Sequence, residues 1–260
     1  MCSSDLKHFS EFFSVYNKGI TNPTVDMGVW ISGFFGSGKS HFLKILSFIL
    51  DGNLVINGRK PLDFFIEDEK IKDPIVMANM ENSSKVNADV ILFNIDSKSS
   101  SQSNSNKDPI LDVFYNAFNE MRGYSGNKPF LAELEKELDE SNKYDDFKME
   151  FEKLSGKSWD KKGKYSFKFE RKHIIQSIIN IGFMDKDDAK YWANNAEKTF
   201  EYSIEDFAIE VKEYCDKKGN NHHVVFLVDE VGQYIADDTK LMLNLQTIVE
   251  ELGMKCKRKA

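Results

Sequence analysis

Apolar residues recur along most of this chain at the spacing of an α-helix, interrupted by a few short runs that are apolar throughout. The first helical pattern comprises Leu6, Phe9, Phe12 and Phe13. It predicts an amphipathic helix that ends near residues 17–19. A second pattern over residues 39–50 places its apolar side chains mostly on one face, and Asp51-Gly52 follows as a stop. We therefore expect two helices in the first fifty residues.

Three short apolar runs predict β-strands. Residues 27–31 form a run that leads directly into a glycine-rich stretch, whereas 90–95 and 224–228 are continuous apolar segments. Continuous runs of this kind are typical of parallel strands buried on both faces. Strands interspersed with helices indicate an α/β protein.

The rest of the chain predicts further helices, at residues 110–121, 130–138, 174–179, 189–200, 204–215 and 239–251. Ser203 and Asp206 form a capping-box pattern before one of them. Residues 97–106 are rich in Ser and Asn and predict a solvated loop. The charged stretch that reaches residue 172 gives no clear prediction.

The glycine-rich stretch matches the phosphate-binding pattern G-x-x-x-x-G-K-[ST] in full, between a predicted strand and a predicted helix. Its glycines let successive backbone N–H groups point at phosphate oxygens, and the following helix adds its positive end. We expect Lys39 to contact the β and γ phosphates and act in catalysis, and Ser40 to bind Mg²⁺. The predicted cofactor-binding residues are Gly33, Phe34, Phe35, Gly36, Ser37, Gly38, Lys39, Ser40 and His41.

A second motif follows the run at 224–228. Asp229 lies at the end of this strand, where a carboxylate holds Mg²⁺ through water in nucleotide hydrolases. Glu230 comes next and is our candidate for orienting and activating the attacking water, the alternative being a solvated loop acid. Gln233 has two interpretations, a γ-phosphate sensor or a structural residue, of which the structural one is favoured. Together the two motifs predict binding of ATP and Mg²⁺.

A GTPase is a weaker alternative. Residues 229–232 match D-x-x-G and residues 142–145 match the guanine-reading N-K-x-D. In GTPases the guanine motif follows D-x-x-G and comes after a buried strand, whereas here it precedes that motif in a polar helical region. ATP is therefore the expected nucleotide.

The strings V-W-I-S-G-F-F-G-S-G-K-S-H-F-L-K at 29–44 and V-D-E-V-G-Q at 228–233 resemble the BrxC/PglY family of P-loop proteins from bacterial BREX (bacteriophage exclusion) systems. The resemblance implies a large multidomain AAA+-like ATPase in phage defence, with a methyltransferase and associated subunits as partners. It also implies that this chain is an amino-terminal fragment that hydrolyses ATP poorly by itself. DNA contact through the full-length protein and homo-oligomerisation are further expectations.

The motifs and the resemblance together define an expected organisation. Residues 1–25 form an amino-terminal helical segment, residues 26–97 and 223–260 form the nucleotide-binding core, and residues 98–222 form a mainly helical insertion. The expected fold is α/β, a P-loop NTPase parallel sheet of AAA+ or ASCE type with strand order 5-1-4-3-2, incomplete at its carboxyl end. A chain segment as long as the insertion is too long for a loop.

Composition predicts a cytoplasmic protein. The net charge is −7, so any contact with nucleic acid must be local. The three cysteines are widely spaced, which argues against a disulfide framework or a zinc site, and His222-His223 is interpreted as a strand entry. No signal-peptide pattern or membrane-spanning run is present in the sequence.

Residues 157–172 interleave basic and aromatic side chains, a pattern that binds single-stranded nucleic acid in other proteins. The residues concerned are Lys161, Lys162, Lys164, Lys168, Arg171, Trp159, Tyr165, Phe167 and Phe169. A half-buried hairpin with solvated lysines is the favoured alternative.

Two functions remain open at this point. The chain is either an ATPase module or a scaffold whose ATP is structural and rarely hydrolysed. Replacing Glu230 by Gln separates them, because it should trap ATP only in an ATPase.

Overall fold

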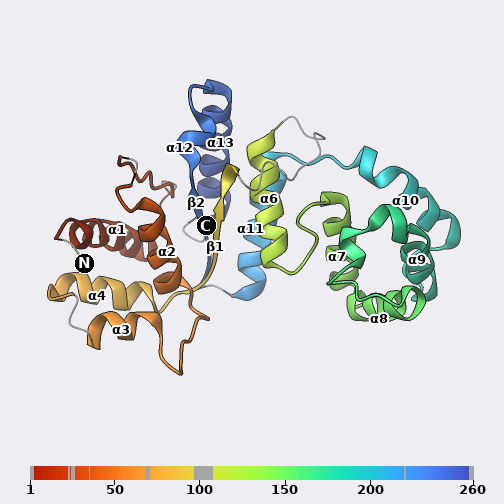
Figure 1. Cartoon of the computed structure of the whole chain (residues 1–260), viewed down its shortest axis with the longest axis horizontal. Coiled ribbons are helices and arrows are strands. Elements are labelled where there is room, and N and C mark those ends of the chain that lie inside the picture. The colour runs from red at the N-terminus through yellow and green to blue at the C-terminus, as the bar shows by residue number, and fades with distance from the viewer. Residues whose placement is uncertain are drawn as a thin grey trace. The chain divides into compact units, whose positions relative to one another are not determined.

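The computed structural model describes residues 3–22, 24, 27–34, 36–67, 71–96, 108–219 and 221–257. The chain divides into two compact units, coloured along the sequence in Figure 1. The first unit combines residues 1–100 with 203–260, and the second spans residues 101–202.

The sheet of the first unit consists of two parallel strands in the described part of the chain. Strand β1 (Asn87–Asn94) pairs with β2 (His222–Asp229), with Asn87 opposite His222 and Asn94 opposite Asp229. The strands predicted at 90–95 and 224–228 are thus confirmed. They are far apart in the sequence, and the whole second unit lies between them in the chain.

The predicted fold class is wrong. The described chain is mostly helical and its sheet has two strands, whereas we expected a P-loop NTPase sheet with an insertion. Residues 27–34 form no strand, because no neighbouring segment pairs with their backbone within the described residues. Their apolar side chains have other surroundings: Ile31 packs against the core, and Val29 and Trp30 are more than half exposed. An apolar run becomes a strand only when a neighbour supplies hydrogen bonds.

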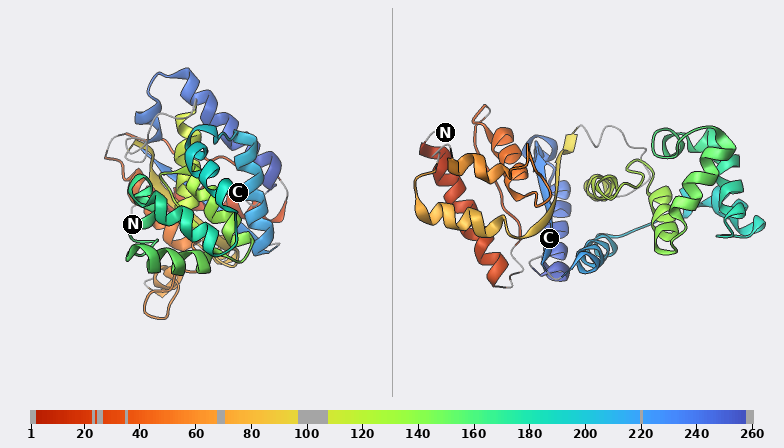
Figure 2. Two further views of the ribbon diagram at one scale, coloured as in Figure 1. Left: turned by 90° about the vertical axis from the view of Figure 1, so that its right-hand side faces the viewer. Right: turned by 90° about the horizontal axis from the view of Figure 1, so that it is seen from below.

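Four helices lie on one side of the two strands (Figure 2, right). They are α1 (Ser3–Thr21), α2 (Lys39–Leu50), α3 (Pro61–Glu67) and α4 (Pro74–Ser83). Helices α1 and α2 fall where the periodicity predicts them, while α3 and α4 were not predicted. Buried residues of these helices share a core with Leu227 of β2, and Val90 and Val225 pack against it. The side chains at these three strand positions therefore point toward α2.

Helices from the carboxyl-terminal part cover the other face of the sheet. They are α11 (Ile204–Lys218), α12 (Val231–Ile235) and α13 (Thr239–Cys256). The ring of Phe207 in α11 lies 5.9 Å from that of Phe226 in β2, and α11 packs along α13. The predicted capping box of Ser203 and Asp206 is present. Helix α11 thus belongs to the same unit as β2, although the sequence groups residues 98–222 as one insertion.

The second unit is helical. Its helices are α6 (Pro109–Met121), α7 (Pro129–Glu140), α8 (Tyr144–Ser155), α9 (Phe167–Asn180) and α10 (Lys186–Thr199), with a 3₁₀ turn η1 (Gly163–Tyr165). Trp159 is 1% exposed, and its ring meets those of Phe147 and Phe151 edge-on at 4.9 and 5.1 Å. The charged stretch without a clear prediction is therefore built around an aromatic core.

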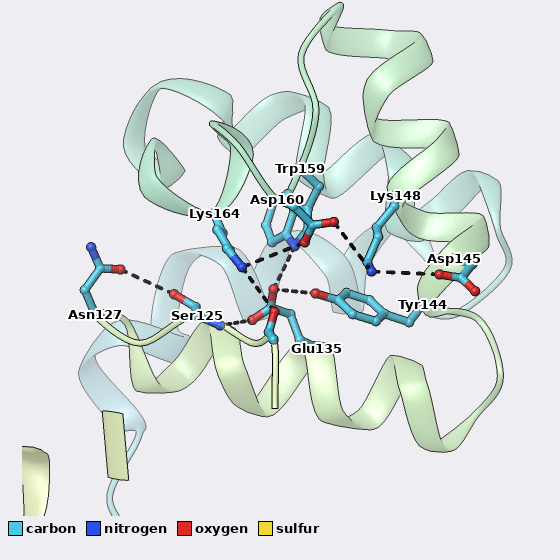
Figure 3. A network of polar contacts seen from close by, with 10 residues as sticks. Ser125, Asn127, Glu135, Tyr144, Asp145, Lys148, Trp159, Asp160 and Lys164 are labelled. Atoms are coloured by element: carbon cyan, nitrogen blue, oxygen red, sulfur yellow. Dashed lines mark hydrogen bonds and ion pairs between the residues drawn. The ribbon is translucent and has the colours of Figure 1, made fainter. Parts of the chain in front are cut away.

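A buried carboxylate ties this core together (Figure 3). Glu135 of α7 is fully buried and accepts hydrogen bonds from the Tyr144 hydroxyl at 2.7 Å and the Trp159 Nε1 at 2.7 Å. Its second oxygen accepts from the Ser125 N–H at 2.5 Å. Burial raises the pKa of the Glu135 carboxyl, although these hydrogen bonds and nearby Lys164 act in the opposite direction. The network holds together segments that have no ladder of backbone hydrogen bonds between them.

Candidate functional site

The direction of α2 over the sheet is fixed at its carboxyl end. The N–H of Gly52, just after the helix, donates to the carbonyl oxygen of Ala88 at 3.3 Å, and the side-chain amide of Asn53 donates to Asp89 at 3.3 Å. Both partners lie at the start of β1. Because α2 packs against both strands, its opposite end, at Lys39, extends toward the carboxyl ends of the strands. The helix is about 18 Å long, long enough to span most of the strand length.

Strand geometry brings two polar residues to the same place. Side chains alternate between the two faces of a strand, so Asp229 lies on the same face as Leu227, the face covered by α2. Asn94 lies on that face for the same reason, because it follows Val90 by four residues along β1. In the register of the two strands, Asn94 pairs with Asp229. Asn94 was not predicted as a site residue. The signal was present as the only polar residue in the run at 90–95.

The loop before α2 has the backbone that its glycines predict. Gly36 and Gly38 have φ of 77° and 89°, and a side chain at either would meet no atom within 4 Å. A Cβ at Gly33 would lie 2.7 Å from the Ser37 hydroxyl oxygen. Gly36 and Gly38 are therefore favoured for their conformation, whereas a side chain at position 33 would require the Ser37 side chain to move.

The start of α2 suits an anion. Gly38 is the N-cap residue and supplies no side-chain cap, so the first N–H groups of the helix have no partner from this position. Uncapped N–H groups and the helix dipole favour negative charge there. The Lys39 ammonium lies over the loop and donates to the carbonyl oxygens of Gly33 at 2.8 Å and Phe34 at 2.9 Å. Ser40 and His41 are exposed.

Other predicted loop residues differ in their surroundings. Phe34 is 92% exposed, and its carbonyl oxygen accepts from the Ser37 N–H at 3.1 Å. Phe35 lies outside the described residues. The glycine loop therefore offers backbone groups and an exposed ring, and the charge near it comes from Lys39.

The turn after β2 is strained. Glu230 has φ of 62°, in the left-handed region that costs a residue with a side chain about 1–2 kcal/mol. Its N–H donates to the Asp229 carboxylate at 3.0 Å, which orients that carboxylate at the strand end. Asp229 and Glu230 are both half-buried, and Gln233 is exposed in α12. Backbone strain of this kind concentrates at functional sites.

The residues present fit a hydrated magnesium ion. Mg²⁺ takes few protein oxygens and keeps several waters together with substrate phosphate oxygens, so a serine hydroxyl and one carboxylate suffice. Ser40 lies in the first turn of the helix that extends toward Asp229, and both residues supply hard oxygen atoms. In the described part of the chain, no group of three or more His, Cys, Asp or Glu side chains gathers as a metal cluster.

The two histidines at 222 and 223 lie at the other end of the sheet. His222 Nε2 is 2.9 Å from the Asp89 carboxylate, and His223 Nδ1 is 3.4 Å from the Tyr16 hydroxyl. Both side chains are buried at the strand entry, where we expected them. Cys215 and Cys256 are buried, and Cys2 lies outside the described residues.

The residues of the N-K-x-D match contribute to packing in the second unit. Asn142 adopts a positive φ of 54° in the turn between α7 and α8, and Lys143 donates to the carbonyl oxygens of Ile181 and Gly182 at 3.1 and 2.8 Å. Tyr144 is buried against Glu135. These contacts give the motif a structural explanation that does not involve guanine.

The pattern at 157–172 divides into buried and exposed halves. Trp159 and Phe167 are core residues, and Lys164 is buried with its ammonium 3.1 Å from the Gly123 carbonyl oxygen. Tyr165 and Phe169 are 57% and 89% exposed. The segment forms a 3₁₀ turn and a helix, so the predicted hairpin is wrong, whereas the half-buried segment with solvated lysines at 161, 162 and 168 is confirmed.

Comparison with known proteins adds no further assignment. No protein-family model matches the chain, and no solved structure matches it. None of the described helices is both long and apolar enough to cross a membrane.

Proposed function

We propose that the loop at residues 33–40 and the end of β2 bind the phosphates of a nucleoside triphosphate together with Mg²⁺, and that the nucleotide is ATP. The observation that carries this proposal is the direction of α2. Its carboxyl end is bonded to the start of β1, so the uncapped amino end extends toward Asp229. A positive helix end and a carboxylate are the two groups that a phosphate-bound magnesium ion needs.

Each residue then has a defined role. Backbone N–H groups of the loop and the first turn of α2 bind the β-phosphate, and the Lys39 ammonium exchanges its carbonyl partners for β- and γ-phosphate oxygens. Ser40 and Asp229 hold Mg²⁺, Asp229 through water. Mg²⁺ neutralises charge on the phosphates when it is bound.

Hydrolysis is the proposed reaction. Glu230 accepts a proton from a water molecule, whose oxygen forms a bond to the γ-phosphorus while the bond to the bridging oxygen of ADP breaks. The strained backbone at Glu230 supports this role over that of a loop acid, because a glycine would fit the conformation with less strain. Glu230→Gln keeps the size of the side chain, so it should retain binding and abolish turnover. Turnover equal to that of the wild type would remove Glu230 from the mechanism, and ATP that binds to the wild type without turnover would have a structural role.

The biological setting proposed from the sequence resemblance is a BREX-type phage-defence complex with a methyltransferase and associated subunits. The string at 29–44 supports it. Co-purification of the tagged chain with such subunits from cells that carry a BREX system tests the setting. If those subunits do not bind to the tagged chain, the result argues against this setting.

Binding is tested by thermal shift and calorimetry with Mg-ATP and Mg-GTP. At a ligand concentration about a hundredfold over its dissociation constant, the folded state gains roughly 2.7 kcal/mol. Lys39→Ala should remove this gain. Lys44→Ala is the matched control, because Lys44 is an exposed lysine of the same helix, more than one turn further on. Equal responses of the wild type and Lys39→Ala, or a preference for GTP, would contradict the proposal.

A further inference from the structure

We propose that the exposed face of α9, with the turn before it, binds single-stranded nucleic acid. This surface consists of Tyr165, Phe169, Lys161, Lys162, Lys168 and Lys172 and is called the basic-aromatic face. It belongs to the second unit and is independent of the nucleotide site.

The two rings of this face are exposed in a way that packing does not explain. Phe169 is 89% exposed, while Phe167 and Ile174 of the same helix are buried and supply its contact with the core. Tyr165 precedes Phe169 by four residues and is 57% exposed. Both rings therefore lie outside the core of the second unit, one in the helix and one in the 3₁₀ turn before it.

The positive charge of the second unit is concentrated on the same segment. Residues 157–172 contain seven lysine or arginine residues and two acidic residues. The two acids are already paired: Glu170 is buried against Lys157 and His173, and Asp160 lies 3.7 Å from Lys148 and 3.8 Å from Lys164. The remaining charge is that of the exposed lysines.

Those lysines are available to an outside partner. Lys161, Lys162, Lys168 and Lys172 are exposed and form no ion pair within the described residues. Lys172 follows Phe169 by three residues, on the same side of the helix, and Lys168 comes directly before Phe169. Ammonium groups around an exposed ring match a polyanion that also carries flat aromatic groups.

Single-stranded nucleic acid has both properties. Its phosphates pair with lysines, and its unpaired bases stack on aromatic rings with little dependence on sequence. A duplex hides the faces of its bases, and an acidic peptide offers charge without a regular series of flat groups. The face therefore favours an unpaired strand over these two partners.

Fluorescence anisotropy of the full chain with a labelled oligothymidylate tests the proposal. Four lysine contacts predict a slope of about −2.8 for log K against log salt concentration. Phe169→Leu should weaken binding by at least about fivefold, the loss of one base stack, whereas Phe169→Trp should retain it. Both changes are at a side chain outside the core, so neither should alter the urea-unfolding midpoint or the far-ultraviolet circular dichroism of the chain.

The lysines are tested with a matched pair of double variants. Lys168→Gln/Lys172→Gln should weaken binding and reduce the salt slope by about 1.4. Lys153→Gln/Lys186→Gln changes the net charge equally on α8 and α10 and should leave binding near that of the wild type. Lys39→Ala should also bind the oligonucleotide normally, which separates this face from the nucleotide site.

Several results would overturn the proposal. They are absence of binding by the wild-type chain, equal affinity for a duplex of the same length, equal affinity of Phe169→Leu and Phe169→Trp, or equal effects of the two lysine pairs. Binding to vesicles of anionic lipid that the oligonucleotide does not displace would assign the face to a membrane surface.

Discussion

The backbone N–H of Gly52 donates to the carbonyl oxygen of Ala88 and, together with the bond from Asn53 to Asp89, joins the end of α2 to the start of β1. Gly52 and Ala88 lie close enough that a Cβ on Gly52 would come within 3.2–3.4 Å of backbone atoms of residues 86–88. Backbone cannot move aside as a flexible side chain does. A side chain at position 52 would therefore press against β1 at the point where the end of α2 is attached to it.

Gly52→Ala should therefore destabilise the chain by about 1 kcal/mol or more, through overpacking against β1. Urea unfolding measures the change. Gly19→Ala is the control, because Gly19 lies in α1 and a Cβ there would make an ordinary contact at 3.9 Å. That control should gain about 0.5–1 kcal/mol from helix propensity. If both variants lost stability, the loss in Gly52→Ala could not be assigned to the contact of residue 52 with β1.

The strain at Glu230 predicts that substitutions at this position change stability and activity independently. Glu230→Gly should be more stable than Glu230→Ala by about 1 kcal/mol, because glycine adopts φ of 62° at little steric cost. Neither variant should hydrolyse ATP under the proposed mechanism. Thermal unfolding and a phosphate-release assay give the two quantities. Equal stability of the glycine and alanine variants would show that this backbone relaxes.

Asn94 faces Asp229 across the sheet and offers a test of the proposed metal position. Asn94→Asp should lower the melting temperature, because like charges opposite each other on one sheet face repel. Mg²⁺ should restore part of this loss by binding between the carboxylates, whereas Asn94→Ala should show no such recovery. Melting temperatures with and without Mg²⁺ make the comparison. A divalent-ion effect that is the same for both variants would argue against a cation at this edge.

Glu135 predicts a dependence of stability on pH. Burial raises the pKa of this carboxyl in the folded chain, so folding favours its protonated form. The stability that it contributes is full below the unfolded pKa and is lost as pH rises through the raised folded pKa. The stability of the wild type relative to Glu135→Gln should therefore increase as pH falls from 7 toward 4.5. Urea unfolding at several pH values measures this difference, and a constant difference would contradict it.

The same variant should be destabilised at neutral pH. The carboxylate accepts from Tyr144 and Trp159 on one oxygen and from the Ser125 N–H on the other. An amide has one acceptor oxygen, so the substituted side chain would place its NH₂ against a donor in either orientation. An unsatisfied buried donor costs about 1–3 kcal/mol. Loss of the near-ultraviolet signal of Trp159 would report the same conflict.

Helices with a strong apolar face and clear ends could be predicted from the sequence. Helix α2 has the predicted bounds, and the capping box at Ser203 marks the start of α11. Helix α4 was missed although Asp73-Pro74 is a good start signal and Asp73 does cap it. Helix α8 was missed because its many charges obscured Tyr144, Phe147 and Phe151, which are buried. The local sequence signals for these helices were therefore present in the chain, including those for the helices that we did not predict.

The sheet could not be predicted in the same way. The runs at 90–95 and 27–31 are both apolar, yet the first is a strand and the second is not. The difference lies in the pairing with residues 222–229, which are far away in the chain. The loop residues of the candidate site follow from a local motif, whereas Asn94 needed the register of the strands. Sequence patterns predict the local conformation of a segment better than they predict which other segment it pairs with.

The order of the elements also has a consequence for synthesis. Strand β1 is complete at residue 94, but its partner begins at residue 222, after the entire second unit. At roughly 5–20 residues per second, about 6–26 s pass before β2 leaves the ribosome. During that time the apolar strand has an open edge, the kind of surface that associates with other chains. The second unit is continuous in sequence and can fold within this interval, so chaperone demand should fall on the first unit, between the emergence of β1 and that of β2.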